Sequence, residues 1–199
     1  MKRIIIAMIL TIIVVISLSA QTGKSNFYFD IGFGVGGGTT KVDGKDVADV
    51  FDKEAADVFV GLAKVGIRLP SSSMPIYLTF ELSGTGNSYT VNKIDNMLVM
   101  CGTVQYNSYL LAPGVVVYPS PLFQLSVSLG YAYDAIATNV NMMDTNTGGG
   151  GFGMGASAAI DLGKRRHGVL FGINYHMAST EKIDTSYFGG FVKYVFREK

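Results

Sequence analysis

Apolar and polar residues alternate one by one through most of the chain after residue 26, and turn residues separate the alternating segments. Successive side chains of an extended strand point to opposite faces, so this period of two predicts β-strands. The clearest segment is 123–134, in which Phe, Leu, Val and Tyr alternate with Gln, Ser, Gly, Ala and Asp. The pattern predicts eight strands, at about 26–39, 59–69, 76–84, 102–118, 123–134, 152–162, 169–177 and 186–196.

The predicted connections alternate between short and long. The short ones, rich in Pro, Ser or Gly, lie at 70–75, 119–122 and 163–168. Long polar ones are expected at about 40–57, 84–101, 136–150 and 179–185. An even number of antiparallel strands, with short turns at one end and long loops at the other, is the plan of an outer-membrane barrel whose short turns face the periplasm. The sequence therefore predicts an all-β fold, an eight-stranded antiparallel up-and-down transmembrane β-barrel.

The two faces of the predicted strands differ in polarity. One face carries Phe, Leu, Ile and Val, with Tyr often near the strand ends, and the other carries Gly, Ala, Ser, Thr, Asn and single charges. A lumen eight strands wide leaves little room, and lipid favours apolar groups outside with aromatic groups at the interfaces. We therefore expect the apolar face to meet lipid.

The segment 102–118 is less regular than the others. Tyr109 and Leu111 are assigned to the same face as Gln105 and Asn107, which is the lumen side in this interpretation. A bulge or a loss of phase is expected near Pro113, because proline donates no hydrogen bond to the ladder.

A glycine cluster in the first segment permits a second interpretation. Gly32, Gly34 and Gly37 fit the G-x-G-x-x-G fingerprint of a dinucleotide-binding turn. That turn needs a helix directly after the glycines, whereas the residues after Gly38 show no amphipathic helical pattern. The alternation instead places Gly32, Gly34 and Gly36 toward the lumen of a strongly curved sheet, and no nucleotide or other cofactor is expected.

The first twenty residues differ from the rest. A basic pair precedes an uncharged apolar run that ends in small residues, which is the layout of a secretory signal peptide. Residues 1–20 are therefore predicted to be a signal peptide, cleaved after Ala20 or, as an alternative, after Ser19, and 21–199 to be the outer-membrane barrel. An uncleaved membrane anchor is the other interpretation, but its apolar part is short for a span of about 20 residues.

Composition excludes several other classes of protein. The chain has 25 Gly, 12 Phe and 11 Tyr but no Trp, and 16% of its residues are charged, against about 25% in typical soluble domains. After Ala20 there is no apolar run of 18 residues, which excludes a helical membrane protein. Without residues 1–20 the net charge is −1, from 14 basic and 15 acidic residues, so nucleic acid is not an expected partner. The single Cys101 excludes an internal disulfide, and the two His show no metal-ligand spacing.

These features resemble the small eight-stranded outer-membrane proteins of the OmpX, OmpW and OmpA membrane-domain type. The most specific part is the last strand, where Tyr194 and Phe196 look like the C-terminal signal by which such barrels are recognised for insertion. The chain departs from the pattern because Gly190 is one position off the usual glycine and 197–199 follow the terminal Phe. The resemblance implies location in the bacterial outer membrane, contact with its lipid, and passage through periplasmic chaperones and the barrel-assembly machinery.

Six charged residues, three acidic and three basic, are expected on the lumen side. They are Asp30, Lys64, Arg68, Glu81, Asp161 and Lys193. Strand direction places all of them in the periplasmic half, and a turn at 70–75 that pairs residues whose numbers sum to 145 sets Lys64 opposite Glu81. An unpaired charge in a poorly hydrated lumen is costly, so these side chains are expected to pair. We hypothesise a plug that closes the barrel; the alternative is a gated pore in which the pairs exchange partners.

Catalysis is not expected from this set of residues. His167 lies in a basic turn, and His176 points into the lumen, where Asp134 is a candidate partner and Ser179 is close in sequence. An enzyme needs a base and a nucleophile within mutual reach. An inward His on a polar face is more often a hydrogen-bonded filler than a catalytic base.

The outer loops are the expected functional surface, since loops on a rigid scaffold commonly carry binding function. The expected function is a structural or surface-interaction protein of the adhesion type, with an extracellular ligand bound through these loops. The alternative is a narrow channel for small or hydrophobic solutes. For such a channel, Leu62, Tyr109, Leu111 and Leu170 supply only a partial apolar lining.

Overall fold

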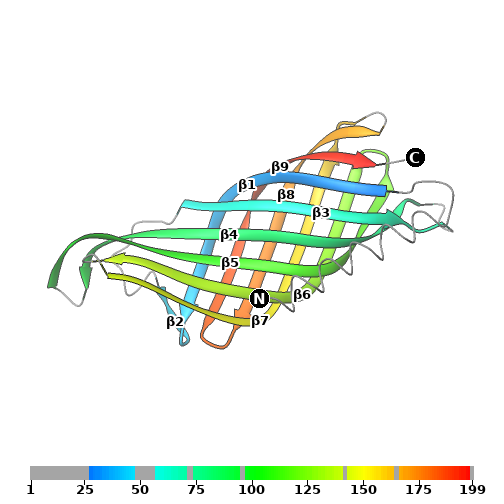
Figure 1. Ribbon diagram of the computed structural model, residues 1–199. Coiled ribbons are helices and arrows are strands. Elements are labelled where there is room, and N and C mark those ends of the chain that lie inside the picture. Colours follow the sequence, from blue (N-terminus) through cyan, green and yellow to red (C-terminus); the bar gives the residue numbers. More distant parts are fainter. Residues whose placement is uncertain are drawn as a thin grey trace.

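The computed structural model shows the chain as one closed barrel of tilted strands (Figure 1). It describes residues 27–47, 57–70, 74–94, 97–140, 143–163 and 166–197. The predicted signal peptide, 1–20, lies outside the described residues. No helix in the described part is long and apolar enough to cross a membrane.

Nine strands are described, and eight of them form the wall of the barrel. Their bounds are β1 Phe27–Val42, β2 Lys45–Asp46, β3 Asp57–Arg68, β4 Ile76–Ile94, β5 Met97–Ser120, β6 Phe123–Val140, β7 Met143–Asp161, β8 His167–Thr180 and β9 Ile183–Arg197. The ninth, β2, is a two-residue strand that folds back on the outer end of β1. Asp43 and Gly44 form this turn with φ of 49° and 79°, the left-handed pair that tight hairpins favour.

Each wall strand pairs with the next along the chain, and β1 pairs with β9 to close the barrel. Following paired residues once around the wall from Ile31, through Ala63, Leu82, Leu111, Tyr131, Phe152, Ser179 and Asp184, leads back to β1 at Lys41. The stagger is therefore ten residues, from 31 to 41. Eight strands at a steep tilt enclose a lumen just wide enough for side chains to fill.

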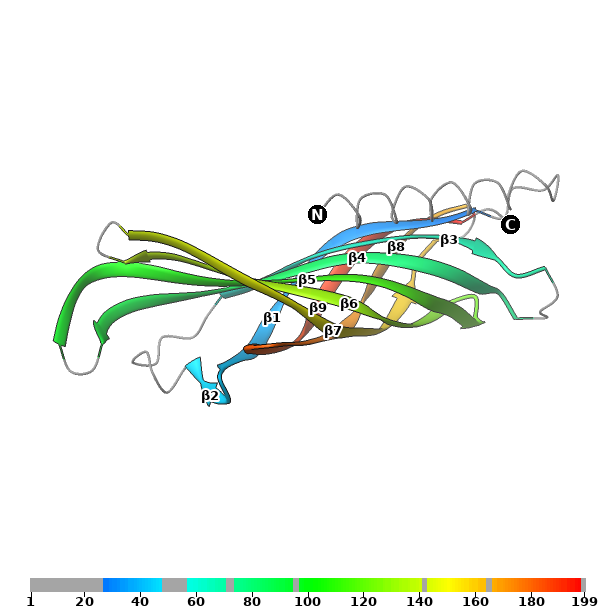
Figure 2. The same cartoon turned by 60° about the horizontal axis from the view of Figure 1, so that its bottom comes forward.

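The predicted long loops are wrong in three of four places. The strands continue far into 84–101, 136–150 and 179–185: β4 ends at Ile94 and β5 begins at Met97, β6 ends at Val140 and β7 begins at Met143, and β8 ends at Thr180 and β9 begins at Ile183. Figures 1 and 2 show β4 to β7 running well beyond the ends of β1, β8 and β9. Alternation fades there because strands that project beyond lipid need no apolar outer face, whereas backbone pairing continues. Of the fourth loop, 40–57, the first part is β1 and β2, and 48–56 lies outside the described residues.

The predicted faces of β5 are also wrong. Tyr109 is 48% exposed on the outer wall, whereas Leu110 is fully buried in the lumen. The register between β4 and β5 is constant from Ile76↔Val117 to Val91↔Gly102, so Pro113 causes neither a bulge nor a loss of phase. Its missing donor interrupts pairing with β6 only locally, between Leu111↔Tyr131 and Gly114↔Ser128, and the same register resumes. A bulky apolar residue on both faces made the sequence pattern ambiguous in this strand.

The other strands have the predicted orientation, with apolar side chains outside. The exposed apolar wall includes Ile31, Phe33, Val35, Leu78, Leu82, Leu125, Val127, Leu129, Ile160, Phe171, Ile173, Phe188 and Val192. Exposed Tyr109, Tyr131 and Tyr133 border this wall toward the outer end of β5 and β6. An apolar band bordered by aromatic residues is the surface that a lipid bilayer requires of a barrel.

Candidate functional site

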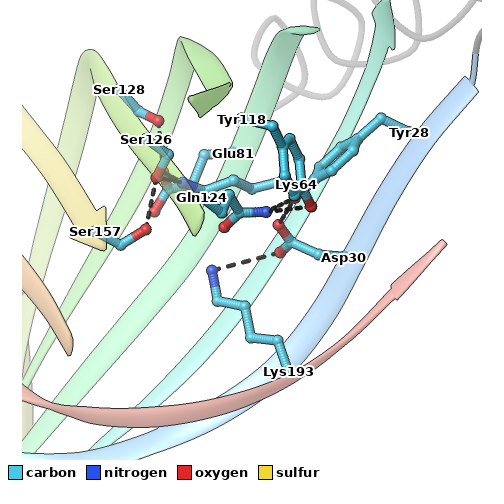
Figure 3. Close-up of polar contacts among 10 residues, drawn as sticks. All are labelled: Tyr28, Asp30, Lys64, Glu81, Tyr118, Gln124, Ser126, Ser128, Ser157 and Lys193. Carbon is cyan, nitrogen blue, oxygen red and sulfur yellow. Dashed lines mark hydrogen bonds and ion pairs between the residues drawn. The ribbon is translucent and has the colours of Figure 1, made fainter. Parts of the chain in front are cut away.

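The middle of the lumen is occupied by a buried ion pair. Lys64 on β3 and Glu81 on β4 are direct partners in the ladder, as the sum of 145 predicted, and Lys64 Nζ lies 3.1 Å from Glu81 Oε2. Ser128 donates to the Glu81 carboxylate at 2.6 Å, and Lys64 donates to Ser126 Oγ at 2.6 Å. Both charges are therefore paired and further hydrogen-bonded (Figure 3), which is the condition for burying them at moderate cost.

A second ion pair lies beside the first. Lys193 Nζ on β9 is 3.5 Å from Asp30 Oδ1 on β1, and both side chains are buried. Tyr28 donates its hydroxyl hydrogen bond to the other oxygen of Asp30. Gln124 donates to the hydroxyl of Tyr28 at 2.7 Å and to that of Tyr118 at 3.0 Å, so the network crosses the lumen from β1 to β5 and β6 (Figure 3).

The third pair, Arg197 with Asp161, includes a residue that the sequence interpretation missed. The Arg197 guanidinium on β9 pairs with the Asp161 carboxylate on β7 and donates to the carbonyl of Gly163 at 3.0 Å. It also lies over the ring of Tyr118, 5.1 Å from the centroid. The signal was present, because alternation from Lys193 places Arg197 on the lumen side of the same strand. The resemblance to the insertion signal instead places 197–199 in a tail after the terminal Phe196.

Arg68 is the predicted cluster member that does not join these pairs. It lies half-buried at the periplasmic end of β3, and the described residues offer it no hydrogen bond or ion pair. It lines a cavity of about 560 Å³ at that end of the barrel, together with Arg197. The six predicted residues thus divide into two buried pairs, an acid paired with an unpredicted base, and one base at a cavity.

Glycines on β7 allow side chains from the opposite wall to fill the lumen. A Cβ at Gly155 would lie 3.0 Å from Glu81 Oε1, and one at Gly153 would lie 2.7 Å from Leu110 Cδ1. The space left beside Lys64 and Glu81 has a volume of about 10 Å³, roughly that of a single water molecule. The lumen is therefore packed at the level of the ion pairs.

An apolar cluster lies farther out, beyond the outer tyrosines of the wall. Val47, which follows β2, packs with Tyr89, Val104 and Tyr106, inward-facing residues of β4 and β5. Burial raises the pKa of Tyr106 to about 12, and the neighbouring Tyr89 adds to the shift. The β1–β2 hairpin thus packs against β4 and β5 at the outer end of the barrel. We call these four residues the cap.

The candidate catalytic residues lie between the buried ion pairs and the cap. His176 Nε2 is 3.3 Å from Ser108 Oγ, and no hydrogen bond joins its Nδ1 to the Asp134 carboxylate. Asp134 therefore does not orient His176 as the carboxylate of a catalytic triad would. No group of three or more His, Cys, Asp or Glu in the described part is arranged to hold a metal ion.

Comparison with solved structures identifies the fold. The attachment invasion locus protein Ail of Yersinia pestis, solved with the heparin analogue sucrose octasulfate, aligns with a TM-score of 0.58 at 11% identity. The alignment covers 87% of this chain and 99% of Ail. The chain has the fold of the small outer-membrane β-barrels.

Two further alignments give the same coverage of this barrel, 87%. A second Ail structure aligns with a TM-score of 0.51 at 14% identity over 99% of its chain. Neisserial surface protein A aligns with a TM-score of 0.48 at 10% identity over 97% of its chain. No protein-family model matches the sequence, and no curated protein matches it either. The apolar wall and the closed fold together place the barrel in the bacterial outer membrane.

Proposed function

We propose that the barrel is a closed membrane anchor that acts by presenting its projecting sheet, the outer parts of β4 to β7, to extracellular partners. The packed lumen carries the proposal. Two buried ion pairs and the Tyr28–Gln124 network fill the middle, and the cap packs at the outer end. A solute would have to separate these pairs, and each separated charge would lie unpaired in a poorly hydrated lumen.

The projecting sheet supports a role in surface interaction. β5 has 24 residues, whereas about 9–11 suffice for a transmembrane strand. Within the described residues, β7 has no partner on its β8 side over 143–150, and β4 has none on its β3 side over 89–94. Edges of this kind offer unpaired backbone N–H and C=O groups, to which an extended segment of another protein can add as a strand.

The charges of this barrel do not favour a polyanion such as the heparin analogue bound to Ail. Heparin-like polyanions need clustered basic residues. The described outer ends instead mix both signs: Lys41 pairs across the ladder with Asp184, and Lys45 follows Asp43. Backbone pairing at the projecting sheet, rather than charge, is the mode of recognition that we propose.

Insertion by periplasmic chaperones and the barrel-assembly machinery belongs to the same proposal. Tyr194 is exposed on the outer wall of β9, and Phe196 packs against Phe27 of β1, with ring centroids 6.3 Å apart. Both residues are thus at the seam where the last strand closes the barrel, the place where an insertion signal would be presented until closure.

Planar-bilayer recording tests the closed lumen. The wild-type barrel is expected to show no steady ohmic current. Truncating Lys64, Glu81 and Lys193 together to Ala is expected to produce openings, because it empties the middle of the lumen. Steady channels in the wild type that are unchanged by these substitutions would contradict the plug and favour the narrow channel.

Shortening the projecting sheet tests the surface role. Replacing 90–103 and, separately, 138–145 by Asn-Gly keeps Tyr89 opposite Val104 and Ala137 opposite Asn146, with a turn that suits two-residue hairpins. The doubly shortened barrel is expected to fold and to remain closed, while bacteria displaying it lose adhesion to a surface coated with extracellular matrix. The matched control replaces only the 181–182 turn by Asn-Gly. Equal adhesion by wild type and the shortened barrel would refute the role of the sheet.

A further inference from the structure

The periplasmic end of the barrel contains a cavity that the closed lumen does not use. It has a volume of about 560 Å³, within the range of about 300–1,000 Å³ typical of small-molecule sites. Its lining includes Arg68, Tyr77, Tyr118, Leu122 and Arg197. It lies at the end with the short turns, so its mouth faces the periplasm.

Among the described residues, the charges around the cavity do not balance. Arg197 is neutralised by Asp161, just as Lys64 and Lys193 are neutralised by Glu81 and Asp30. Arg68 has no acid partner among the described residues, although it is half-buried. A guanidinium in this position presents a fork of donors that matches a carboxylate in a bidentate geometry.

The remaining lining combines two tyrosines and three prolines with Met74, Ser120, Leu122 and Gly163. The rings of Tyr77 and Tyr118 are edge-to-face with centroids 6.0 Å apart, and both tyrosines are almost fully buried. Gln124 holds the hydroxyl of Tyr118. Pro75, Pro119 and Pro121 complete the wall, and proline has no backbone donor that would demand a polar partner. Such a lining favours a flat apolar body on the ligand.

We propose that this cavity is a binding site for a small organic carboxylate with an aromatic or compact apolar body, taken up from the periplasm. Arg68 binds the carboxylate, and the tyrosine rings and prolines hold the apolar part. The site is independent of the projecting sheet and of lumen closure, because the ion pairs lie between it and the outer mouth.

The test uses the barrel, 21–199, in phosphatidylcholine nanodiscs with 4-fluorobenzoate as the probe, followed by ¹⁹F relaxation. The wild type is expected to bind it. 4-Fluorobenzyl alcohol is expected to bind, and acetate to displace the probe, at least about tenfold more weakly, since each lacks one half of the recognition. Arg68→Gln is expected to weaken binding of 4-fluorobenzoate by about tenfold or more, while Lys45→Gln, a matched charge removal at the other end, leaves it unchanged.

A second measurement needs no variant. In the wild type, 4-fluorobenzoate is expected to shift the backbone amide resonances of Arg68, Tyr77 and Leu122, and not those of the β1–β2 hairpin. Absence of binding to the wild type, equal binding of the alcohol, or unchanged binding by a folded Arg68→Gln barrel would each overturn the proposal. Shifts confined to the outer end would overturn it as well.

Discussion

Replacing Lys64 with Met is expected to lower the free energy of unfolding by about 3–5 kcal/mol, the usual cost of removing one partner of a buried ion pair. Glu81 would remain in the lumen, where it is 3% exposed and hydrogen-bonded to Ser128, without the cation 3.1 Å away. Urea denaturation of the barrel in detergent micelles measures the change. Circular dichroism is the suitable probe, because the chain contains no Trp.

The double variant Lys64→Met with Glu81→Leu separates a charge effect from a packing effect. It is expected to recover most of the lost stability, since replacing a whole buried pair by apolar residues is often close to neutral. Lys45→Met, at an exposed position in β2, is the matched control and is expected to change little. If Lys64→Met proved as stable as the control, the buried pair would not be part of the folded barrel.

Arg substituted at Val127 is expected to destabilise the barrel by about 2–4 kcal/mol, the cost of a cation at the middle of the bilayer. Val127 is 51% exposed and lies in the centre of the apolar run of β6, between Phe123 and the outer tyrosines. The same substitution at Tyr133, on the same outer face but close to the interface, is expected to cost only about 0–1 kcal/mol. Reversible unfolding in lipid vesicles measures both values. Equal costs at the two positions would contradict the membrane placement of the wall.

Alternation predicted the fold and most of the lumen because a narrow barrel in lipid sets opposite requirements for its two faces. The hairpin at 70–75 fixed the register of β3 and β4, and with it the partnership of Lys64 and Glu81. In β5 the alternation does not distinguish the outer face from the lumen face, because Tyr109 on the outer face and Leu110 in the lumen are both large and apolar. The sequence pattern predicts loops for the outermost strand segments because an apolar face is needed only where a strand contacts lipid. Backbone pairing continues beyond the lipid without leaving such a pattern.

The errors at the periplasmic end have a different origin. Pairing across the lumen joins strands that are distant in the chain, such as β7 and β9 for Asp161 and Arg197, and local spacing carries no information about it. The same holds for Gly155, whose role becomes visible only when the Glu81 carboxylate is seen 3.0 Å from the position of its missing Cβ.

The continuity of β4 to β7 from the membrane to their outer tips has a mechanical consequence. A pull applied at the described outer ends of β4 or β6, Ile94 or Val140, would pass along the strands into the wall and load many ladder bonds together in shear. An irregular loop under the same load would extend first, and its contacts would break one after another. The attachment should therefore withstand flow, and single-molecule pulling from these tips is expected to require more force than pulling from the 43–44 turn.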